Sequence, residues 1–171
     1  MITENEKKLF EEVGKRNPDF EKINEIINKG VNINIRNENG KTLLMYALKY
    51  LNEIIWQDEN GNLAETGDEA NELLQRMVPK INISIIKYLL EKGVDPNIED
   101  NYGYRCLNIA VVTFRSDVFK LLLEYNADIN YNVYREEKFC DWINDELNEF
   151  YNDGNNIAVQ EISKMVEMLK E

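Results

Sequence analysis

The sequence contains no histidine. Histidine is the usual general base near neutral pH, the partner of catalytic serine and cysteine nucleophiles, and the commonest metal ligand, so its absence excludes most familiar hydrolase mechanisms. The two cysteines, Cys106 and Cys140, are far apart and in no CxxC or metal-ligand spacing. They therefore predict neither a disulfide framework nor a zinc site, and we expect neither to act as a nucleophile.

Long hydrophobic runs are absent as well. No stretch reaches the roughly 18–20 apolar residues that a membrane span requires. The first residues, MITENEKKLFEE, carry charges where a signal peptide has its apolar core. We therefore expect a cytoplasmic protein that does not enter a membrane.

Acidic residues are in excess. The 171 residues, 43% of them hydrophobic and 30% charged, suit one compact domain with a net charge of −12. Residues 51–80 hold 7 acidic and 2 basic residues, and residues 131–171 hold 10 and 4. A negative field repels phosphate backbones and anionic membranes but attracts basic proteins. We expect a basic protein partner, no nucleic acid and no membrane surface, and a monomer when the protein is free.

One helix ending occurs three times in the chain. The segments are IINKGVNIN at 26–34, LLEKGVDPN at 89–97 and LLEYNADIN at 122–130. Gly30, Gly93 and Asn126 take the same place in each, and glycine and asparagine tolerate the left-handed conformation that ends a helix. The last two copies are 33 residues apart and the first two 63, which indicates a 33-residue repeat with a 30-residue insertion.

A second shared element follows the first two copies, GKTLLMYA at 40–47 and GYRCLNIA at 103–110. With these motifs the chain resembles the ankyrin repeat, whose consensus is G-x-T-P-L-H-x-A, two helices ending in L-L-x-x-G-A-D-x-N, and a hairpin loop. The consensus histidine is replaced by Met45 and Asn108, so we expect weaker hydrogen bonding between neighbouring loops. It looks like a small bacterial-type ankyrin protein with degenerate repeats.

This resemblance implies an all-α, ankyrin-type helical solenoid of about four helix pairs, with short hairpin loops and one long insertion. The expected units are an N-terminal capping pair (1–37), a repeat with the insertion at about 51–80 (38–100), a second repeat (101–133) and a C-terminal capping pair (134–171). A capping box of Thr3 and Glu6 predicts the start of the first helix. Near the C-terminus, apolar residues at helical spacing predict a buried face that includes Ile143, Leu147, Phe150 and Tyr151.

The resemblance also implies a binding surface, because partners of ankyrin proteins usually dock on the concave face formed by the loop tips and the first helix of each repeat. The variable loop positions are the candidate contacts, and tyrosines there are typical interface anchors. Trp56 joins them because it lies in the acidic insertion. The predicted partner-binding residues are Arg36, Glu38, Asn39, Lys41, Trp56, Glu99, Asn101, Tyr102, Tyr104, Asn132 and Tyr134.

Catalysis would have to rest on carboxylates. Asp141, Asp145 and Glu149 share one helix face and could hold a hard cation, but a solvated face opposite Ile143 explains the same spacing. No phosphate-binding glycine loop is present. We predict no catalytic residues, no metal and no cofactor, and hence no enzyme.

The leading hypothesis is a non-catalytic protein-protein interaction module that binds and inhibits a basic protein, as the immunity protein of a toxin system does. The concave loop face and the acidic insertion would make the contacts, since acidic inhibitors associate quickly with basic partners. One alternative is an adaptor or effector that recruits a cellular protein. The other is a carboxylate and metal-dependent enzyme, which the sequence favours least.

Overall fold

A computed structural model describes residues 2–15, 17–52, 83–133, 137–152, 154 and 156–170. The predicted insertion at about 51–80, with Trp56, therefore lies almost entirely outside the described residues, and so does Tyr134.

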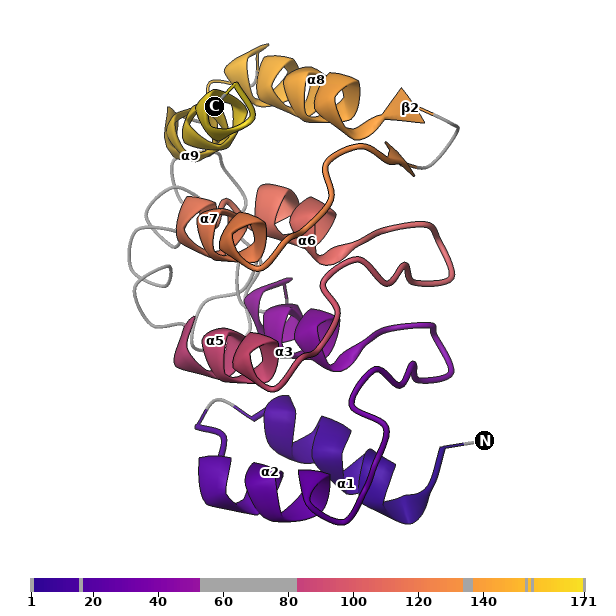
Figure 1. Ribbon diagram of the computed structural model, residues 1–171. Helices are drawn as coiled ribbons and strands as arrows, with labels where there is room; N and C mark the ends of the chain where they lie inside the picture. Colours follow the sequence, from indigo (N-terminus) through magenta and orange to yellow (C-terminus); the bar gives the residue numbers. More distant parts are fainter. Residues whose placement is uncertain are drawn as a thin grey trace.

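Helices arranged in antiparallel pairs form the described part of the molecule. The pairs are α1 (Glu4–Val13) with α2 (Phe20–Ile27), α3 (Leu43–Asn52) with α5 (Ile83–Glu91), α6 (Cys106–Val112) with α7 (Ser116–Glu124), and α8 (Phe139–Asn152) with α9 (Asn156–Met168). Figure 1 shows them stacked in two layers: α1, α3, α6 and α8 lie nearer the projecting loops, and the second helix of each pair lies farther from the loops. The expected all-α repeat solenoid is confirmed.

Local capping explains where these helices begin and end. Thr3 and Glu6 form the predicted capping box, in which the Thr3 backbone N–H donates to the Glu6 carboxylate at 2.6 Å. At the other ends, Gly30, Gly93 and Asn126 have φ angles of +80°, +87° and +61°. These left-handed residues turn the chain out of the helix into the next loop, as the repeat predicts.

A short hairpin replaces the extended loop before the last pair. β1 (Asn132–Val133) pairs antiparallel with β2 (Glu137–Lys138), with Asn132 opposite Lys138. In the described residues these two strands form the only sheet. The hairpin leads directly into α8, so α8 has the same position after its loop as α3 and α6 have after theirs (Figure 1).

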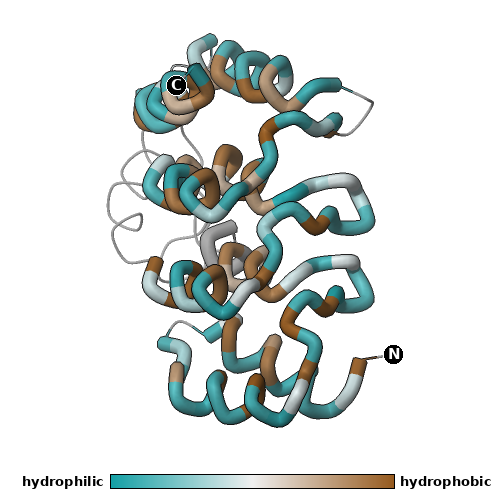
Figure 2. Tube along the Cα trace, viewed as in Figure 1, coloured by the Kyte–Doolittle hydropathy of each residue, from teal (hydrophilic) through white to brown (hydrophobic). Residues whose placement is uncertain are grey.

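One hydrophobic cluster runs through all four helix pairs, from Leu9 in α1 to Met165 in α9. Figure 2 shows hydrophilic residues predominating along the loops and hydrophobic ones interspersed along the helices. Ile143 is buried and Leu147 and Phe150 pack against the cluster, as predicted. The prediction is wrong for Tyr151, which is 72% exposed because α8 nears its end there and points this position to solvent.

Candidate functional site

Three connecting segments project from the same side of the helix stack: residues 30–42, residues 93–105, and residues 126–133 with 137–138 (Figure 1). Together with the first helix of each pair they form an exposed face, which we call the loop face. Its geometry depends on what holds neighbouring loops in register.

A side-chain bridge joins the tips of the first two loops. The Arg36 guanidinium donates to Asn101 Oδ1 at 2.9 Å and to its own loop at the Gly40 carbonyl at 3.0 Å. Asn101 Nδ2 in turn donates to the Glu38 carbonyl at 3.2 Å. Three residues that the sequence predicts as partner contacts, Arg36, Glu38 and Asn101, are thus brought together.

The final asparagine of the repeated helix ending makes a second set of ties closer to the helices. Asn34 Oδ1 accepts the Asp95 backbone N–H at 2.8 Å, and Asn97 Oδ1 accepts that of Asp128 at 2.7 Å. Asn97 Nδ2 also donates to the Asn126 carbonyl at 3.1 Å. These bonds join consecutive loops despite the missing consensus histidine.

Asn108, which stands at a consensus histidine position, also contributes to the link between loops. Its Oδ1 accepts from the Tyr131 hydroxyl at 2.7 Å and from the Arg105 backbone N–H at 2.8 Å. The Arg105 guanidinium lies 4.0 Å from the Tyr131 ring centroid and pairs with Glu99 at 2.8 Å and Asp128 at 3.4 Å. Glu99 is therefore occupied by an internal ion pair.

The predicted contact residues differ in exposure. Lys41 and Tyr104 are half-buried, and Tyr104 packs against the core cluster. Tyr102 is 65% exposed, so the loop-tip tyrosine available to a partner is Tyr102 rather than Tyr104. The predicted residues that are exposed are Arg36, Glu38, Asn39, Glu99, Asn101, Tyr102 and Asn132.

Carboxylates concentrate at the C-terminal end of the loop face. Three of them, Asp141, Asp145 and Glu149, are exposed at four-residue spacing on α8. Partial desolvation and the nearby Asp145 and Asp141 raise the pKa of Glu137 on β2. Partial burial and the neighbouring Glu149 likewise raise the pKa of Glu146. These five side chains, four on α8 and Glu137 on β2, concentrate negative charge in one region, and we call them the α8 carboxylates.

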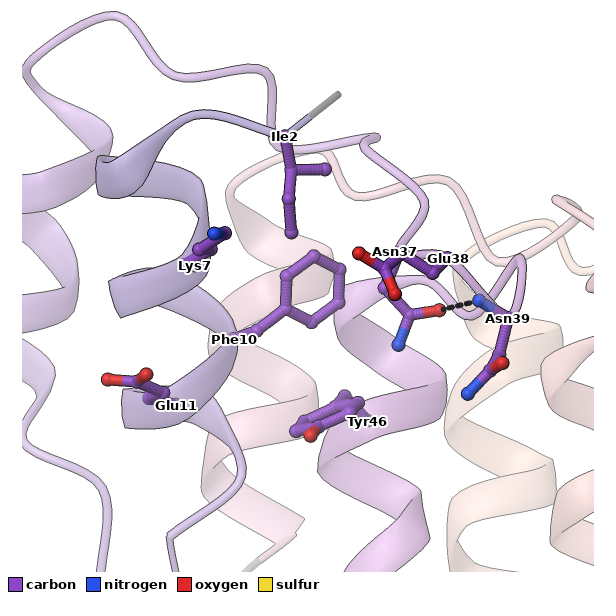
Figure 3. A pocket seen from close by; sticks show the side chains of 8 residues that line it. All are labelled: Ile2, Lys7, Phe10, Glu11, Asn37, Glu38, Asn39 and Tyr46. Atoms are coloured by element: carbon purple, nitrogen blue, oxygen red, sulfur yellow. Dashed lines mark hydrogen bonds between the residues drawn. The ribbon is translucent and has the colours of Figure 1, made fainter.

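A cavity of about 250 Å³ opens at the other end of the loop face. It lies between α1, α3 and the tip of the first loop (Figure 3). Of the predicted residues it includes Glu38 and Asn39. The helix residues that line it are not apparent from the sequence, because only the packing of α1 against α3 brings them to the loop. The lining residues are Ile2, Lys7, Phe10, Glu11, Asn37, Glu38, Asn39 and Tyr46.

Features of a metal centre or a membrane span do not occur in the described ranges. No group of three or more cysteine and acidic side chains there is arranged to hold a metal ion, the α8 carboxylates included. Cys106 is fully buried, and burial raises the pKa of its thiol to about 12, which disfavours the nucleophilic thiolate. Among the described helices none is long and apolar enough to cross a membrane.

Comparison with known proteins agrees with this architecture. A family model described as ankyrin repeats (3 copies) matches residues 53–133. The chain is 32% identical over 116 residues to the ankyrin repeat protein FPV034 of Fowlpox virus, covering 67% of the chain and 28% of that protein. It is 27% identical over 110 residues to an ankyrin repeat protein of Rickettsia bellii, covering 60% of the chain and 33% of that protein. The chain thus spans about a third or less of these curated relatives.

A solved structure shares the fold. It is the complex of the predatory endopeptidase Bd0816 from Bdellovibrio bacteriovorus with immunity protein Bd3460. One chain of that complex superposes with a TM-score of 0.53 and 20% sequence identity, covering 90% of this chain and 61% of that one.

Stacked helix pairs with loops held in register define a helical repeat protein that presents an extended face. The chain belongs to the ankyrin repeat family. Ankyrin repeats bind other proteins, so the chain is a protein-interaction module.

Proposed function

We propose that the chain binds a basic protein through its loop face and inhibits it, as an immunity protein neutralises a toxin. It acts without catalysis or cofactor, in the cytoplasm, and is a monomer when free. The acidic segment 51–80 with Trp56 supplies a further contact to the partner.

The observation that carries this proposal is the cluster of α8 carboxylates. Desolvation and, after it, the neighbouring carboxylates raise the pKa of Glu137 and Glu146, so a cationic partner placed beside them adds an attractive interaction and offsets the repulsion among them. A field of this sign also accelerates the encounter with a basic protein. The inhibitory role is suggested by the fold shared with the endopeptidase and immunity protein complex.

A capture experiment with matched variants tests the proposal. The tagged chain is incubated with lysate of the source organism at about 50 mM and about 500 mM salt, and bound proteins are identified by mass spectrometry. One variant removes three charges from α8: Asp141→Asn, Asp145→Asn and Glu149→Gln. The control removes three exposed charges from the second-layer helices: Glu21→Gln, Glu25→Gln and Glu124→Gln.

We expect one dominant basic partner, lost at high salt and in the α8 variant but retained by the control, because Debye screening weakens exposed charge pairs. Co-expression should then suppress the partner's toxicity. Capture of neutral proteins that survive high salt would refute the proposal and favour the adaptor, whose interface would centre on exposed apolar residues such as Tyr102.

A further inference from the structure

The cavity between α1 and α3 has an apolar floor. The Phe10 and Tyr46 rings meet edge to face with their centroids 5.3 Å apart, and Ile2 lies beyond Phe10 at the N-terminal edge (Figure 3). Phe10 is only 4% exposed, so this floor is anchored in the core rather than mobile on the surface. Apolar stems pack against aromatic rings of this kind, and cations bind over the ring faces.

Glu38 gives the cavity its charge. Its carboxylate reaches from the loop toward the Phe10 ring (Figure 3). Asn101 bonds only the Glu38 backbone carbonyl, and among the described residues no cation forms an ion pair with the Glu38 side chain. On the opposite wall, Lys7 and Glu11 lie one helical turn apart and offset each other's charge. The rim therefore has a net negative charge next to an aromatic floor.

The size of the cavity indicates what enters it. At about 250 Å³ it is smaller than the roughly 300–1,000 Å³ of most small-molecule sites. It suits one long side chain of a docked protein. A basic side chain fits best, because its apolar stem can lie on the rings while its head reaches the carboxylate at the rim.

We propose that this cavity receives an arginine side chain of the basic protein partner, an inference that rests on the proposed function. The planar guanidinium can stack on the Tyr46 ring and donate two hydrogen bonds to the Glu38 carboxylate, whereas an ammonium group is a compact, strongly hydrated point charge. An apolar or phenolic side chain would instead desolvate Glu38 without compensating its charge.

NMR titration of the full chain with small probes tests this assignment. The probes are N-acetyl-arginine amide, N-acetyl-lysine amide and N-acetyl-norleucine amide, followed through backbone amide shifts. We expect saturable shifts at residues 37–39 and 46 with the arginine probe and weaker binding of the other two. Glu38→Gln should raise the dissociation constant about tenfold, the loss of one charge-assisted contact. Glu25→Gln, the same change on exposed α2, should have no effect.

A second variant should change the affinity for the arginine probe in the opposite direction. Lys7→Glu adds a negative charge to the rim and should tighten binding of the arginine probe, while Lys29→Glu, exposed just beyond α2, should not.

Equal binding of the norleucine or lysine probe would overturn the proposal, as would arginine-induced shifts confined to the α8 carboxylates. If a captured basic partner binds the Glu38→Gln variant as tightly as the wild type, this inference fails and the proposed function stands. If the arginine probe binds at the cavity but no basic partner is captured, the proposed function fails, and the preference of the cavity for an arginine side chain stands.

Discussion

Glu12 shows how a single buried charge is stabilised in the first helix pair. Its side chain is 3% exposed, and one carboxylate oxygen lies 2.7 Å from the amino groups of both Lys15 and Lys22. The other oxygen accepts the Asp19 backbone N–H at 3.2 Å, and Asp19 is the residue that caps α2. The hydrogen bonds from Lys15 and Lys22 lower the pKa of Glu12 to about 2.

This depressed pKa predicts pH-dependent stability. Because the folded-state pKa is below the unfolded value of 4.5, the stabilisation is complete above about pH 4.5 and is lost as the pH falls toward 2. We expect Glu12→Gln to lower the free energy of unfolding by about 1–2 kcal/mol at pH 7. Urea unfolding of both proteins at several pH values should show the difference shrinking below pH 4.5. A difference that is constant with pH would mean that the glutamine variant loses packing rather than charge.

At the scale of elements, the first two loops differ in how closely they approach each other. Gly40 and Gly103 take equivalent places in them, with φ angles of +76° and +83°. A Cβ atom at Gly40 would lie 2.6 Å from the Asn101 backbone nitrogen, whereas one at Gly103 would have no atom within 4 Å. The first loop is therefore packed tightly against the second at the Arg36 and Asn101 bridge.

Alanine substitutions at these two glycines should separate backbone strain from loop packing. Gly103→Ala adds the strain of a left-handed residue, which costs about 1–2 kcal/mol. Gly40→Ala adds the same strain and also a clash with the second loop, which costs about 1–3 kcal/mol more. Equilibrium urea unfolding of both variants measures the two losses. Equal losses would show that the loops separate readily and that the bridge contributes little to stability.

At the scale of the whole molecule, the net charge of −12 opposes compaction. Exposed carboxylates gather on α8, with the half-buried Glu137 beside them on β2. Of the ion pairs that the described residues form elsewhere, Lys8 with Glu4 and Lys87 with Glu91 are exposed on both sides. Exposed pairs contribute little to the free energy of folding. General repulsion should therefore outweigh specific attraction in the effect of salt on stability.

Monovalent salt should consequently stabilise the free protein. We expect the thermal midpoint to rise between about 10 mM and 300 mM sodium chloride, since the Debye length falls from about 30 Å to well under 10 Å. Each kcal/mol gained corresponds to about 2–4 °C for a chain of this length. The α8 variant with three charges removed should show a smaller rise than the control with three charges removed from second-layer helices. A midpoint that falls with salt would mean that ion pairs such as Glu12 with its lysines dominate.

Much of this architecture follows from the sequence alone. The helix ends at Gly30, Gly93 and Asn126 depend on local backbone preference, and the apolar spacing of each helix depends on its own residues, so both are visible in the chain. The net charge and the lack of histidine are equally independent of folding. These features determined the repeat class and a protein partner as the expected ligand.

The candidate site was decided by tertiary structure. Lys7, Phe10 and Tyr46 reach the Glu38 loop only because α1 packs against α3, and no spacing within one segment reports that approach. The bridge between Arg36 and Asn101 joins residues 65 positions apart, and it makes two predicted contact residues part of the scaffold as well. Backbone preference acts over a few residues, whereas a cavity or a bridge depends on the distance between elements, which is set when their apolar faces pack together.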